Sequence, residues 1–479
     1  MSQRQSRRSF IQSTAGVGAG FWIANSYAPA WGEEKASDRL RVACVGAGGK
    51  GESDIMKCAN QGQLVVASCD IDAGRANNIA KKIEDKKDPR PQVFADFRVM
   101  LDKMHKEIDA VTVSTPDHTH AVAAIAAMNL GKHVYVQKPL THTVHEARVM
   151  RQVASKMKVC TQMGNQGTSL GSLRDGVEMI QSGAIGDVKE VHVWSNRPVW
   201  SQGKKMVQEF ETGAGKPVPA GFDFNLWLGP ASERPYNSAY RHFHWRGLWD
   251  FGTGALGDMA CHTMNLPFWA LELQYPTSMK AQVPAVYEIT PPEWSVIQFE
   301  FPERTVVKTG TKLAPVSMTW YDGTKTGLPK EARKYASLLA ELGEPKASES
   351  GSLFVGSKGY LYSPGDYANE VRLLPKDQFA SYKKPERWLP RHEGGDMDAN
   401  QTKEWLRAIK ENKPGLAMSN FEYAAYFTEI ILLGNLAMRV PGEQVQWDGP
   451  AMRSTNNDKA NRYVRKEYRK GFELGADLA

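Results

Sequence analysis

Between residues 40 and 140, short apolar runs alternate with stretches of helical periodicity. Each apolar run has the length of one buried strand, and the runs cover residues 40–46, 64–70, 109–116 and 133–139. Of the stretches between them, residues 120–131 have the alanine content and the terminal glycine of a packed helix. Strands that alternate with helices imply parallel crossovers, so the pattern predicts an α/β domain with a doubly wound parallel sheet.

Beyond residue 160 the pattern changes to that of an antiparallel sheet. Its strands are predicted at residues 189–195, 294–301, 304–310 and 352–363. The long segments 199–245 and 311–351 are interpreted as loops, and loops of this length in a compact domain are usually functional. Helical spacing returns at 398–414 and 420–439, and we expect the apolar faces of these two helices to pack on the first domain.

A glycine-rich turn follows the first apolar run. Gly46, Gly48 and Gly51 lie between a predicted strand and a predicted helix, where they would let the backbone approach a pyrophosphate at the helix N-terminus. Asp70 ends the second strand, 19 residues after Gly51, where a carboxylate can accept hydrogen bonds from a ribose. The same carboxylate would repel the extra phosphate of NADP. The pattern therefore predicts a Rossmann domain that binds NAD, with NADP, which nearby Arg75 would favour, as the alternative.

The first 30 residues have the features of an export signal. Arg7 and Arg8 precede Phe10 and Ile11, which resembles the twin-arginine signal of proteins exported in the folded state. An uncharged segment follows, and the small residues that end at Ala30 offer a cleavage site. The segment is short and glycine-rich for a membrane span, which needs about 20 residues. We expect a periplasmic protein that meets the twin-arginine machinery during export and has no membrane anchor after cleavage near Ala30.

Composition adds a few limits to this interpretation. The chain has 60 basic and 53 acidic residues, and removal of the signal with its three arginines leaves a net charge of +4. Such a small excess over about 450 residues indicates no nucleic-acid or membrane surface. A chain of 479 residues normally forms two or more domains, and 41% hydrophobic residues suffice for a sizeable core. Five cysteines make a poor disulfide framework, and buried free thiols agree with folding in the cytoplasm before export.

Three further motifs occur after the glycine turn, in the order STPDHTH, YVQKPL and GDMACHTMN, at residues 114–120, 135–140 and 257–265. With the glycine turn, they resemble the Gfo/Idh/MocA oxidoreductases over nearly all of the chain after the signal. The resemblance implies an N-terminal Rossmann domain and a C-terminal α/β domain. The second domain would contain an open, mostly antiparallel sheet whose face covers the nicotinamide.

The resemblance also implies catalytic roles for three residues. Lys138 matches the lysine that contacts the reacting hydroxyl, where its charge would stabilise a developing alkoxide. Asp258 and His262, spaced i and i+4, match the pair in which the histidine takes the hydroxyl proton and the carboxylate helps to bind substrate. Gln137 replaces the family's usual glutamate and so removes a negative charge that would favour protonated Lys138. A protein that binds the cofactor without catalysis therefore stays an alternative.

The expected binding residues follow from the same motifs. Cofactor contacts are predicted for Gly46, Gly48, Gly49, Gly51, Asp70, Thr115, Pro116, His120, Gln137, Lys138, Asn165 and Gln166. Trp245 and Arg246 are predicted to bind substrate, because indole faces stack on sugar rings and guanidinium groups bind hydroxyls or carboxylates. The histidines occur in pairs, but no acidic or cysteine cluster with ligand spacing accompanies them, so we expect no metal.

These patterns divide the chain into five parts. In order, they are the twin-arginine signal peptide (1–30), a linker (31–39), the NAD-binding Rossmann domain (40–160), a C-terminal substrate and oligomerisation domain (161–440) and a C-terminal tail (441–479). Residues 461–474 alternate charged with aromatic side chains, which is typical of a docked or intersubunit strap and also of a solvated helix. Both alternatives stay open, and we expect a homo-oligomer, either a dimer or a tetramer.

Export with a dinucleotide constrains the chemistry, because the cofactor has no dependable supply outside the cytoplasm. It must be held tightly, or under a clasp that closes over the site, and regenerated where it lies. We therefore predict an NAD(P)-dependent oxidoreductase that acts on a hydroxyl of a sugar, polyol or glycoside with an internally recycled cofactor. The alternatives are an NAD-dependent glycoside-cleaving enzyme, which oxidises transiently and eliminates, and a non-catalytic NAD-bound sugar-binding homologue.

Overall fold

The computed structural model describes residues 39–240, 242–306 and 310–475. The predicted signal peptide and all but the last residue of the predicted linker lie outside this part of the chain. Within it, all five cysteines are buried and free, as expected from their positions in the sequence. No helix of the described residues has both the length and the apolar character needed to cross a membrane.

The N-terminal half forms a parallel sheet of six strands in the order β3-β2-β1-β4-β5-β6. The strands are β1 (Arg41–Val45), β2 (Leu64–Cys69), β3 (Gln92–Phe94), β4 (Ala110–Val113), β5 (His133–Gln137) and β6 (Thr161–Gly164). The crossover helices are α2 (Lys50–Asn60), α3 (Ala73–Asp85), α4 (Phe97–Met104), α5 (Asp117–Asn129) and α6 (Val144–Met157). This strand order confirms the predicted Rossmann sheet. It also places the ends of β1 and β4 side by side at the switch point, where open α/β sheets bind ligands.

The C-terminal half contains a mixed sheet in the order β15-β14-β13-β7-β12-β9-β8-β16-β17. Its strands are β7 (Val188–Trp194), β8 (Ser278–Gln282), β9 (Val296–Phe301), β12 (Val316–Tyr321), β13 (Gly351–Gly356), β14 (Gly359–Pro364), β15 (Arg372–Leu374), β16 (Gln444–Asp448) and β17 (Arg453–Ser454). Among the described strands of this sheet, β12 pairs in parallel with β7, and every other pairing is antiparallel. The predicted second domain, α/β with a mostly antiparallel sheet, is therefore confirmed.

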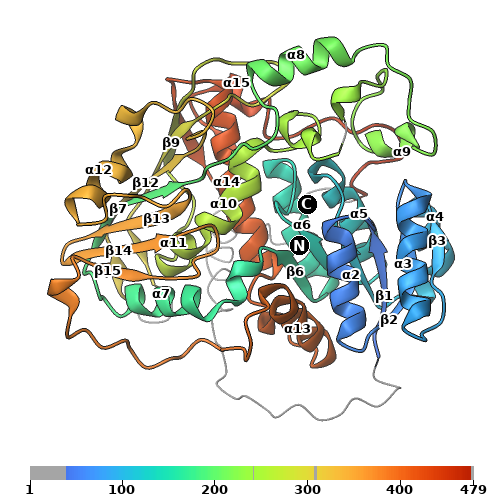
Figure 1. The fold of residues 1–479 in the computed structure, drawn as a ribbon, viewed down its shortest axis with the longest axis horizontal. Coiled ribbons are helices and arrows are strands. Elements are labelled where there is room, and N and C mark those ends of the chain that lie inside the picture. Colours follow the sequence, from blue (N-terminus) through green and yellow to red (C-terminus); the bar gives the residue numbers. More distant parts are fainter. Residues whose placement is uncertain (1–38, 241, 307–309, 476–479) are drawn as a thin grey trace, which may run out of the picture.

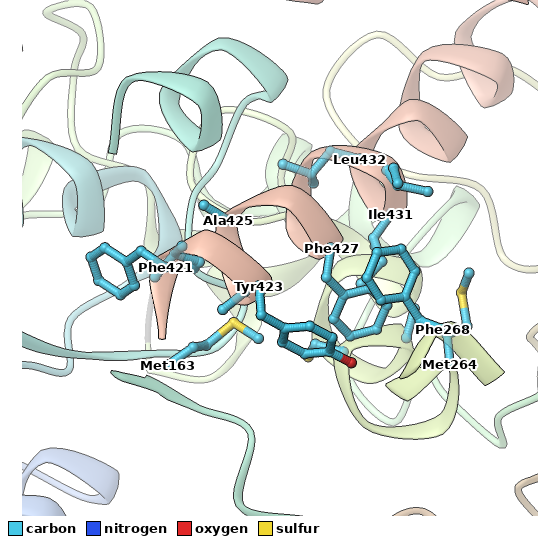
Figure 2. Close-up of a cluster of buried hydrophobic side chains, with 14 of the residues drawn as sticks. Met163, Met264, Phe268, Phe421, Tyr423, Ala425, Phe427, Ile431 and Leu432 are labelled. Carbon is cyan, nitrogen blue, oxygen red and sulfur yellow. The ribbon is translucent and has the colours of Figure 1, made fainter. Parts of the chain in front are cut away.

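One continuous core joins the two halves. Its centre is α14 (Phe421–Arg439), which packs against α6 of the Rossmann domain and against β8 of the second sheet. Figure 2 shows aromatic and aliphatic side chains of α14 between Met163, on β6, and Phe268, on α11 (Asn265–Ala270). The helix is apolar on nearly every face because both domains cover it. Since α13 (Met397–Lys410) also packs against α2, both helices expected to lie on the Rossmann domain do so.

Three predictions about the second half are wrong. The supposed loop 311–351 contains β12, a central strand of the sheet, and α12 (Lys334–Glu341), while 199–245 contains α8 (Lys204–Gly213) and α9 (Phe224–Leu228). Residues 352–363 form most of a hairpin, β13 and β14, rather than one strand. The six residues of β12 alternate side chains as a strand should, but the run is short and lies between stretches without periodicity.

Residues 461–474 dock on their own chain. Lys466 and Tyr468 both bind the buried carboxylate of Glu146, at 2.8 Å (Nζ–Oε1) and 2.9 Å (Oη–Oε1). Arg469 donates from Nε to the backbone oxygen of Gly229 at 2.9 Å and from Nη2 to that of Asn225 at 2.7 Å. The segment is therefore a strap that ties the region around α9 to α6, and not a solvated helix.

Candidate active site

The glycine turn after β1 leaves no room for side chains. Gly46 has φ +89°, and a Cβ there would lie 2.5 Å from the backbone oxygen of Ser114 at the end of β4. A Cβ on Gly51 would lie 2.1 Å from the backbone oxygen of Gly46. Both distances are far below van der Waals contact, so only glycine permits this close passage of β1, β4 and α2. The turn therefore has the backbone shape that the cofactor motif predicts.

A cavity of about 810 Å³ opens over this turn, within the range of small-molecule and cofactor sites. It is lined by ten of the residues that the sequence assigned to binding, namely Gly46, Gly48, Gly49, Asp70, Thr115, Pro116, Gln137, Lys138, Trp245 and Arg246. Residues of both domains line this space, although Val45 and Phe472 lie 427 positions apart in the chain. We refer to it as the cofactor cavity.

Asp70 lies at one end of the cofactor cavity. Its carboxylate accepts hydrogen bonds from the backbone N–H groups of Ala47, at 2.7 Å, and Asp72, at 2.9 Å. Burial raises its pKa, while these two bonds and the charge of Arg75 lower it. The guanidinium of Arg75 lies over Gly48 and is within 3.4 Å of Asp72. The end of the cavity at β2 therefore presents the Asp70 carboxylate as an acceptor for a ribose. The cation beside it, Arg75, already lies close to a second carboxylate, that of Asp72.

Four of the predicted cofactor residues do not line the cavity. Both ring nitrogens of His120 lie 2.8 Å from backbone oxygens, of Pro139 and of Thr115, so the ring joins two loops behind the cavity wall. Asn165 is fully buried, and its side-chain oxygen accepts a hydrogen bond of 2.6 Å from Ser419. Gln166 is buried in the short 3-10 helix that follows, and Gly51 is covered by the turn itself. These residues shape the site without facing its space.

Lys138, which lines the cavity, forms a buried ion pair with Asp258, which does not line it. The Lys138 ammonium donates to Oδ1 of Asp258 at 2.7 Å and to its backbone oxygen at 2.9 Å. Arg246 donates from Nε to the same Oδ1 at 3.2 Å. Burial alone would raise the pKa of Asp258, but the two cations hold it well below its usual range. Burial would likewise lower the pKa of Lys138, yet Asp258 raises it above its usual value, so both groups are charged.

The side chain of Gln137 binds a carboxylate from another helix. Its amide nitrogen donates to Oδ2 of Asp54, on α2, at 2.8 Å, and the Ser114 hydroxyl donates to the same oxygen at 2.8 Å. Lys50 lies 3.1 Å from the other oxygen of Asp54. The sequence suggested that loss of the usual glutamate would leave Lys138 without a supporting negative charge. The structure places that support on Asp258 instead, and Asp54 occupies the space beside residue 137.

His262 lies one helical turn after Asp258 on α10 (Gly254–Thr263) and is 3% exposed. Its ring meets that of Tyr367 edge-on, with 4.7 Å between the centroids, and its Nδ1 has no hydrogen-bond partner among the described residues. Burial, reinforced by the nearby charge of Lys138, lowers its pKa well below the usual value. The imidazole is therefore neutral near pH 7 and able to accept a proton.

Among the lining residues that the sequence analysis did not single out, Asp117 and Phe243 have features that suggest a function. Asp117, at the start of α5, accepts hydrogen bonds from the backbone N–H and the hydroxyl of Thr253, and burial raises its pKa to about 7 despite the charge of Arg246. Phe243 is 47% exposed, has φ +72°, and lies with its ring centre 4.8 Å from the guanidinium of Arg246. Asp117 could have been found from its place beside Thr115 and Pro116, but no sequence signal marks the strained backbone of Phe243.

No group of three or more potential metal ligands occurs in the described residues. Two of the paired histidines instead bind backbone oxygens. His118 lies 3.0 Å from that of Trp227, and His142 lies 2.7 Å from that of Trp249. Burial lowers the pKa of both rings.

A second layer covers the cofactor cavity from the side of the C-terminal domain. Residues 219–240 contribute lining residues, among them Phe222, Trp227 and Tyr240, and the strap adds Phe472. We call residues 219–240 and 465–475 together the cofactor clasp. Figure 1 shows its first part, with α9, along the upper edge of the view and extending from the C-terminal domain towards α4.

The clasp contacts the Rossmann domain at several points. Phe222 forms a β-bridge with Asp72, close to the carboxylate of Asp70. The ring of Phe472 lies under the guanidinium of Arg98, on α4, at 4.0 Å, and Arg98 also donates to the backbone oxygen of Gly471 at 2.8 Å. The clasp thus closes over the end of the cavity that faces α3 and α4.

Fold and site together define a two-domain dinucleotide-binding protein, with a Rossmann domain and a second α/β domain. The chain belongs to the Gfo/Idh/MocA family: models described as "Oxidoreductase family, NAD-binding Rossmann fold" and "Oxidoreductase family, C-terminal alpha/beta domain" match residues 40–165 and 176–334, together more than half of the chain. Its N-terminal half is therefore an NAD-binding Rossmann domain.

Two curated relatives have names that refer to glycoside hydrolysis. The chain is 29% identical over 204 residues to a "Glycosyl hydrolase family 109 protein" of Saccharopolyspora erythraea and to an "Alpha-N-acetylgalactosaminidase" of Shewanella oneidensis. The match covers 38% of this chain and 44% of each relative, less than half of their length.

A solved structure matches over a larger part of the chain. It is the WlbA dehydrogenase of Bordetella pertussis in complex with NADH and UDP-GlcNAcA, which aligns with a TM-score of 0.54 at 16% identity. The alignment covers 86% of this chain and 99% of that chain. At this identity the likeness shows the shared fold.

Proposed function

We propose that the protein is an NAD-dependent oxidoreductase that acts on a hydroxyl of a sugar, polyol or glycoside and keeps its cofactor between turnovers. The observation that carries the proposal is the buried Lys138–Asp258 pair beside the cofactor cavity, with neutral His262 one helical turn away. A buried cation next to a neutral base is the arrangement that oxidation of an alcohol requires.

The residues present fit the cofactor. The backbone of the glycine turn would hold the pyrophosphate and Asp70 the adenosine ribose, while Lys138 and the Thr115–Pro116 turn lie at the other end of the cavity. Bound there, NAD supplies a hydride acceptor for the substrate carbon.

The catalytic groups divide the remaining work between them. His262 accepts the hydroxyl proton, since its imidazole is neutral near pH 7. Lys138, kept charged by Asp258, stabilises the negative charge that develops on the substrate oxygen. Arg246 has further N–H groups for substrate hydroxyls, and the exposed ring of Phe243 offers an apolar face for a sugar ring. The backbone strain at Phe243 agrees with a binding role, because strained residues cluster at ligand sites.

The clasp supports retention of the cofactor. A dinucleotide under residues 219–240 could leave only after the contacts of Arg98, Arg469 and Phe472 have opened. Each 1.4 kcal/mol of clasp stability would lower the rate of loss about tenfold. Retention of this kind suits a protein exported in the folded state and active in the periplasm, and it favours chemistry in which the cofactor ends each turnover in its starting redox state.

Glycoside cleavage is the second candidate, favoured by the names of the curated relatives. In that reaction, transient oxidation of one sugar carbon makes the neighbouring C–H acidic. The glycosidic group then leaves by elimination, water adds, and reduction restores the sugar, so that no net oxidation remains. His262 and Lys138 would serve the oxidation and the reduction in the same way as in a dehydrogenase.

The decisive experiment begins with the native protein, denatured to identify the released nucleotide by mass spectrometry. A panel of sugars, polyols and nitrophenyl glycosides is then tested for nicotinamide absorbance and for products. A ketone or lactone identifies an oxidoreductase, a free aglycone without net cofactor reduction identifies the second candidate, and no reaction with any compound leaves a binding protein.

Variants test the catalytic pair in single-turnover reduction of the bound cofactor. Lys138→Ala and His262→Ala should each lower the rate about 10²–10⁴-fold, and the double variant should lose less than the product of the two effects. Lys156→Ala, at an exposed lysine of α6, is the matched control. Wild-type rates in both single variants would remove these residues from the chemistry.

Retention of the cofactor has its own test. Phe472→Ala and Arg469→Ala should release nucleotide during gel filtration, whereas Lys470→Ala, at an exposed residue of the same segment, should retain it. Full retention in both clasp variants would show that the glycine turn alone holds the cofactor.

A further inference from the structure

A second cavity, of about 250 Å³, shares no lining residue with the cofactor cavity. Its walls are the C-terminal end of α14 and the N-terminus of α6. Two segments before α10, at residues 231–234 and 249–252, and residues 463–467 of the strap complete the lining. The chemistry described above does not use it. Its most unusual member is Arg439, in the last turn of α14.

The guanidinium of Arg439 is held between two aromatic faces without an acidic partner. It lies 4.0 Å from the ring centre of Trp249 and 4.6 Å from that of Tyr463. Its hydrogen bond within the described residues is a long one, 3.4 Å to the backbone oxygen of Glu288, and no described carboxylate lies within ion-pair distance of it. Burial lowers the pKa of Arg439 to about 10. The charges of Asp250 and Glu288 raise this pKa only in part, and neither carboxylate forms an ion pair with Arg439. A partly buried cation without a direct ion pair is suited to bind an anion.

The other charges around the cavity do not meet this need. Arg234 is paired with Asp250, and Lys466 is paired with Glu146 at 2.8 Å. Arg465 has no ion pair in the described part of the chain, and Glu467, the remaining lining carboxylate, is exposed. The unpaired charge that faces the cavity is therefore mainly positive.

One further feature of the wall favours a ligand that accepts a hydrogen bond. It is not the N-terminus of α6, because the capping box of Thr143 and the carboxylate of Glu146 already occupy that end of the helix. Trp249, 8% exposed, has an indole N–H without a hydrogen-bond partner, and the side-chain oxygen of Asn435 has none either. Both residues line the cavity. An oxyanion could accept the hydrogen bond of the Trp249 N–H, whereas the Asn435 oxygen is itself an acceptor and needs a hydroxyl of the ligand as donor.

We propose that this cavity is a binding site for a small oxyanion, either a phosphate or a carboxylate, with Arg439 as its anchor. A guanidinium can bind such groups in a bidentate manner, and stacking between two rings keeps its plane fixed. At about 250 Å³, against about 810 Å³ for the cofactor cavity, the space suits inorganic phosphate or a sugar acid rather than a dinucleotide. Because Tyr463 and Arg465 belong to the strap, the anion would also hold the strap on α14.

The test is thermal unfolding of the full protein with saturating NAD, titrated with sodium phosphate and with sodium glucuronate at constant ionic strength. Sodium chloride is the control for nonspecific screening. We expect a saturable rise in the unfolding midpoint with at least one of the two anions. The anion with the lower half-saturation identifies phosphate or carboxylate as the preferred chemistry.

Arg439→Gln should abolish the rise, and Arg439→Lys should weaken it about tenfold or more because the bidentate contact is lost. Arg407→Gln, which breaks a partly buried ion pair between Arg407 on α13 and its C-cap residue Glu411, far from this cavity in the chain, is the matched control and should behave as the wild type. If Arg439→Gln does not fold, equilibrium dialysis of labelled phosphate and labelled glucuronate against the wild type and Arg465→Gln gives the same information.

Three outcomes would overturn the proposal. One is the absence of a saturable effect with either anion, and a second is an equal effect in Arg439→Gln. The third is a change of oligomeric state in Arg439→Gln without any anion effect, which would assign the counter-charge to a carboxylate of a second copy.

Discussion

Restoring the family's usual glutamate at position 137 should damage this protein. Gln137→Glu would place a second carboxylate at the 2.8 Å that now separates the amide nitrogen from Oδ2 of Asp54. Coulomb's law gives a repulsion of about 6 kcal/mol at this distance with an effective dielectric constant near 20. Lys50 offsets part of it, and one of the two carboxyls can escape the rest by taking a proton. Holding a glutamate protonated at pH 7 costs about 3–4 kcal/mol, because its reference pKa is about 4.3 and each pH unit corresponds to about 1.4 kcal/mol.

The sign of the pH dependence follows from this argument. The pair of carboxyls has a higher pKa in the folded protein than in the unfolded chain, so the stability of Gln137→Glu relative to the wild type is greatest below about pH 4 and falls as the pH rises. The assay is the thermal midpoint of wild type, Gln137→Glu, Asp54→Asn and the double variant between pH 5 and pH 8. The double variant should recover most of the loss, since it exchanges the amide and the carboxylate between the two positions. A Gln137→Glu protein with wild-type stability throughout this range would refute the reasoning.

Three further predictions concern charge and export. Asp117→Asn should gain stability relative to the wild type between pH 5 and pH 7, by up to about 1.4 kcal/mol per pH unit. The wild-type carboxyl has a pKa of about 7 in the folded protein, so over this range it ionises in the unfolded chain first, and the wild type loses stability as the pH rises. Thermal midpoints across this range check the prediction, and a constant difference between the two proteins would contradict it. Asp258→Asn should lower single-turnover rates more at pH 9 than at pH 7, because Lys138 would lose the carboxylate that keeps it charged. A loss of rate that does not depend on pH would assign Asp258 to substrate binding alone. Arg7→Lys with Arg8→Lys should leave the protein in the cytoplasm, as cell fractionation would show, and normal export would exclude a twin-arginine signal.

The Rossmann half could be predicted from the sequence because its information is local. The four predicted strands, β1, β2, β4 and β5, are short apolar runs bounded by turns, and the glycines of the first turn lie within six residues of each other. The three-residue edge strand β3 has no such run and was not predicted. Lys138, Asp258 and His262 were found through motifs, and the structure brings Lys138 and Asp258 into contact. Their catalytic roles remain predictions.

The parts that could not be predicted depend on contacts between distant residues. Nothing near Gln137 in the sequence indicates Asp54, 83 positions earlier, and nothing near Phe472 indicates Arg98. Residues 199–245 were predicted as a loop but contain α8 and α9. The aromatic residues of this segment pack mainly on one another and form a small core of their own. Packing of this kind has no fixed period, and period is the signal from which elements are predicted.

The position of the strap in the chain fixes when the cofactor cavity is closed during synthesis. The last strand of the second sheet ends at Ser454, so both sheets precede residues 465–475 on the ribosome. At about 5–20 residues per second, the 21 residues that follow Ser454 take about one to four seconds to make. Until Phe472 docks on Arg98, the side of the cavity near α4 lacks its cover. A dinucleotide therefore has its most open route into the cavity before Phe472 docks.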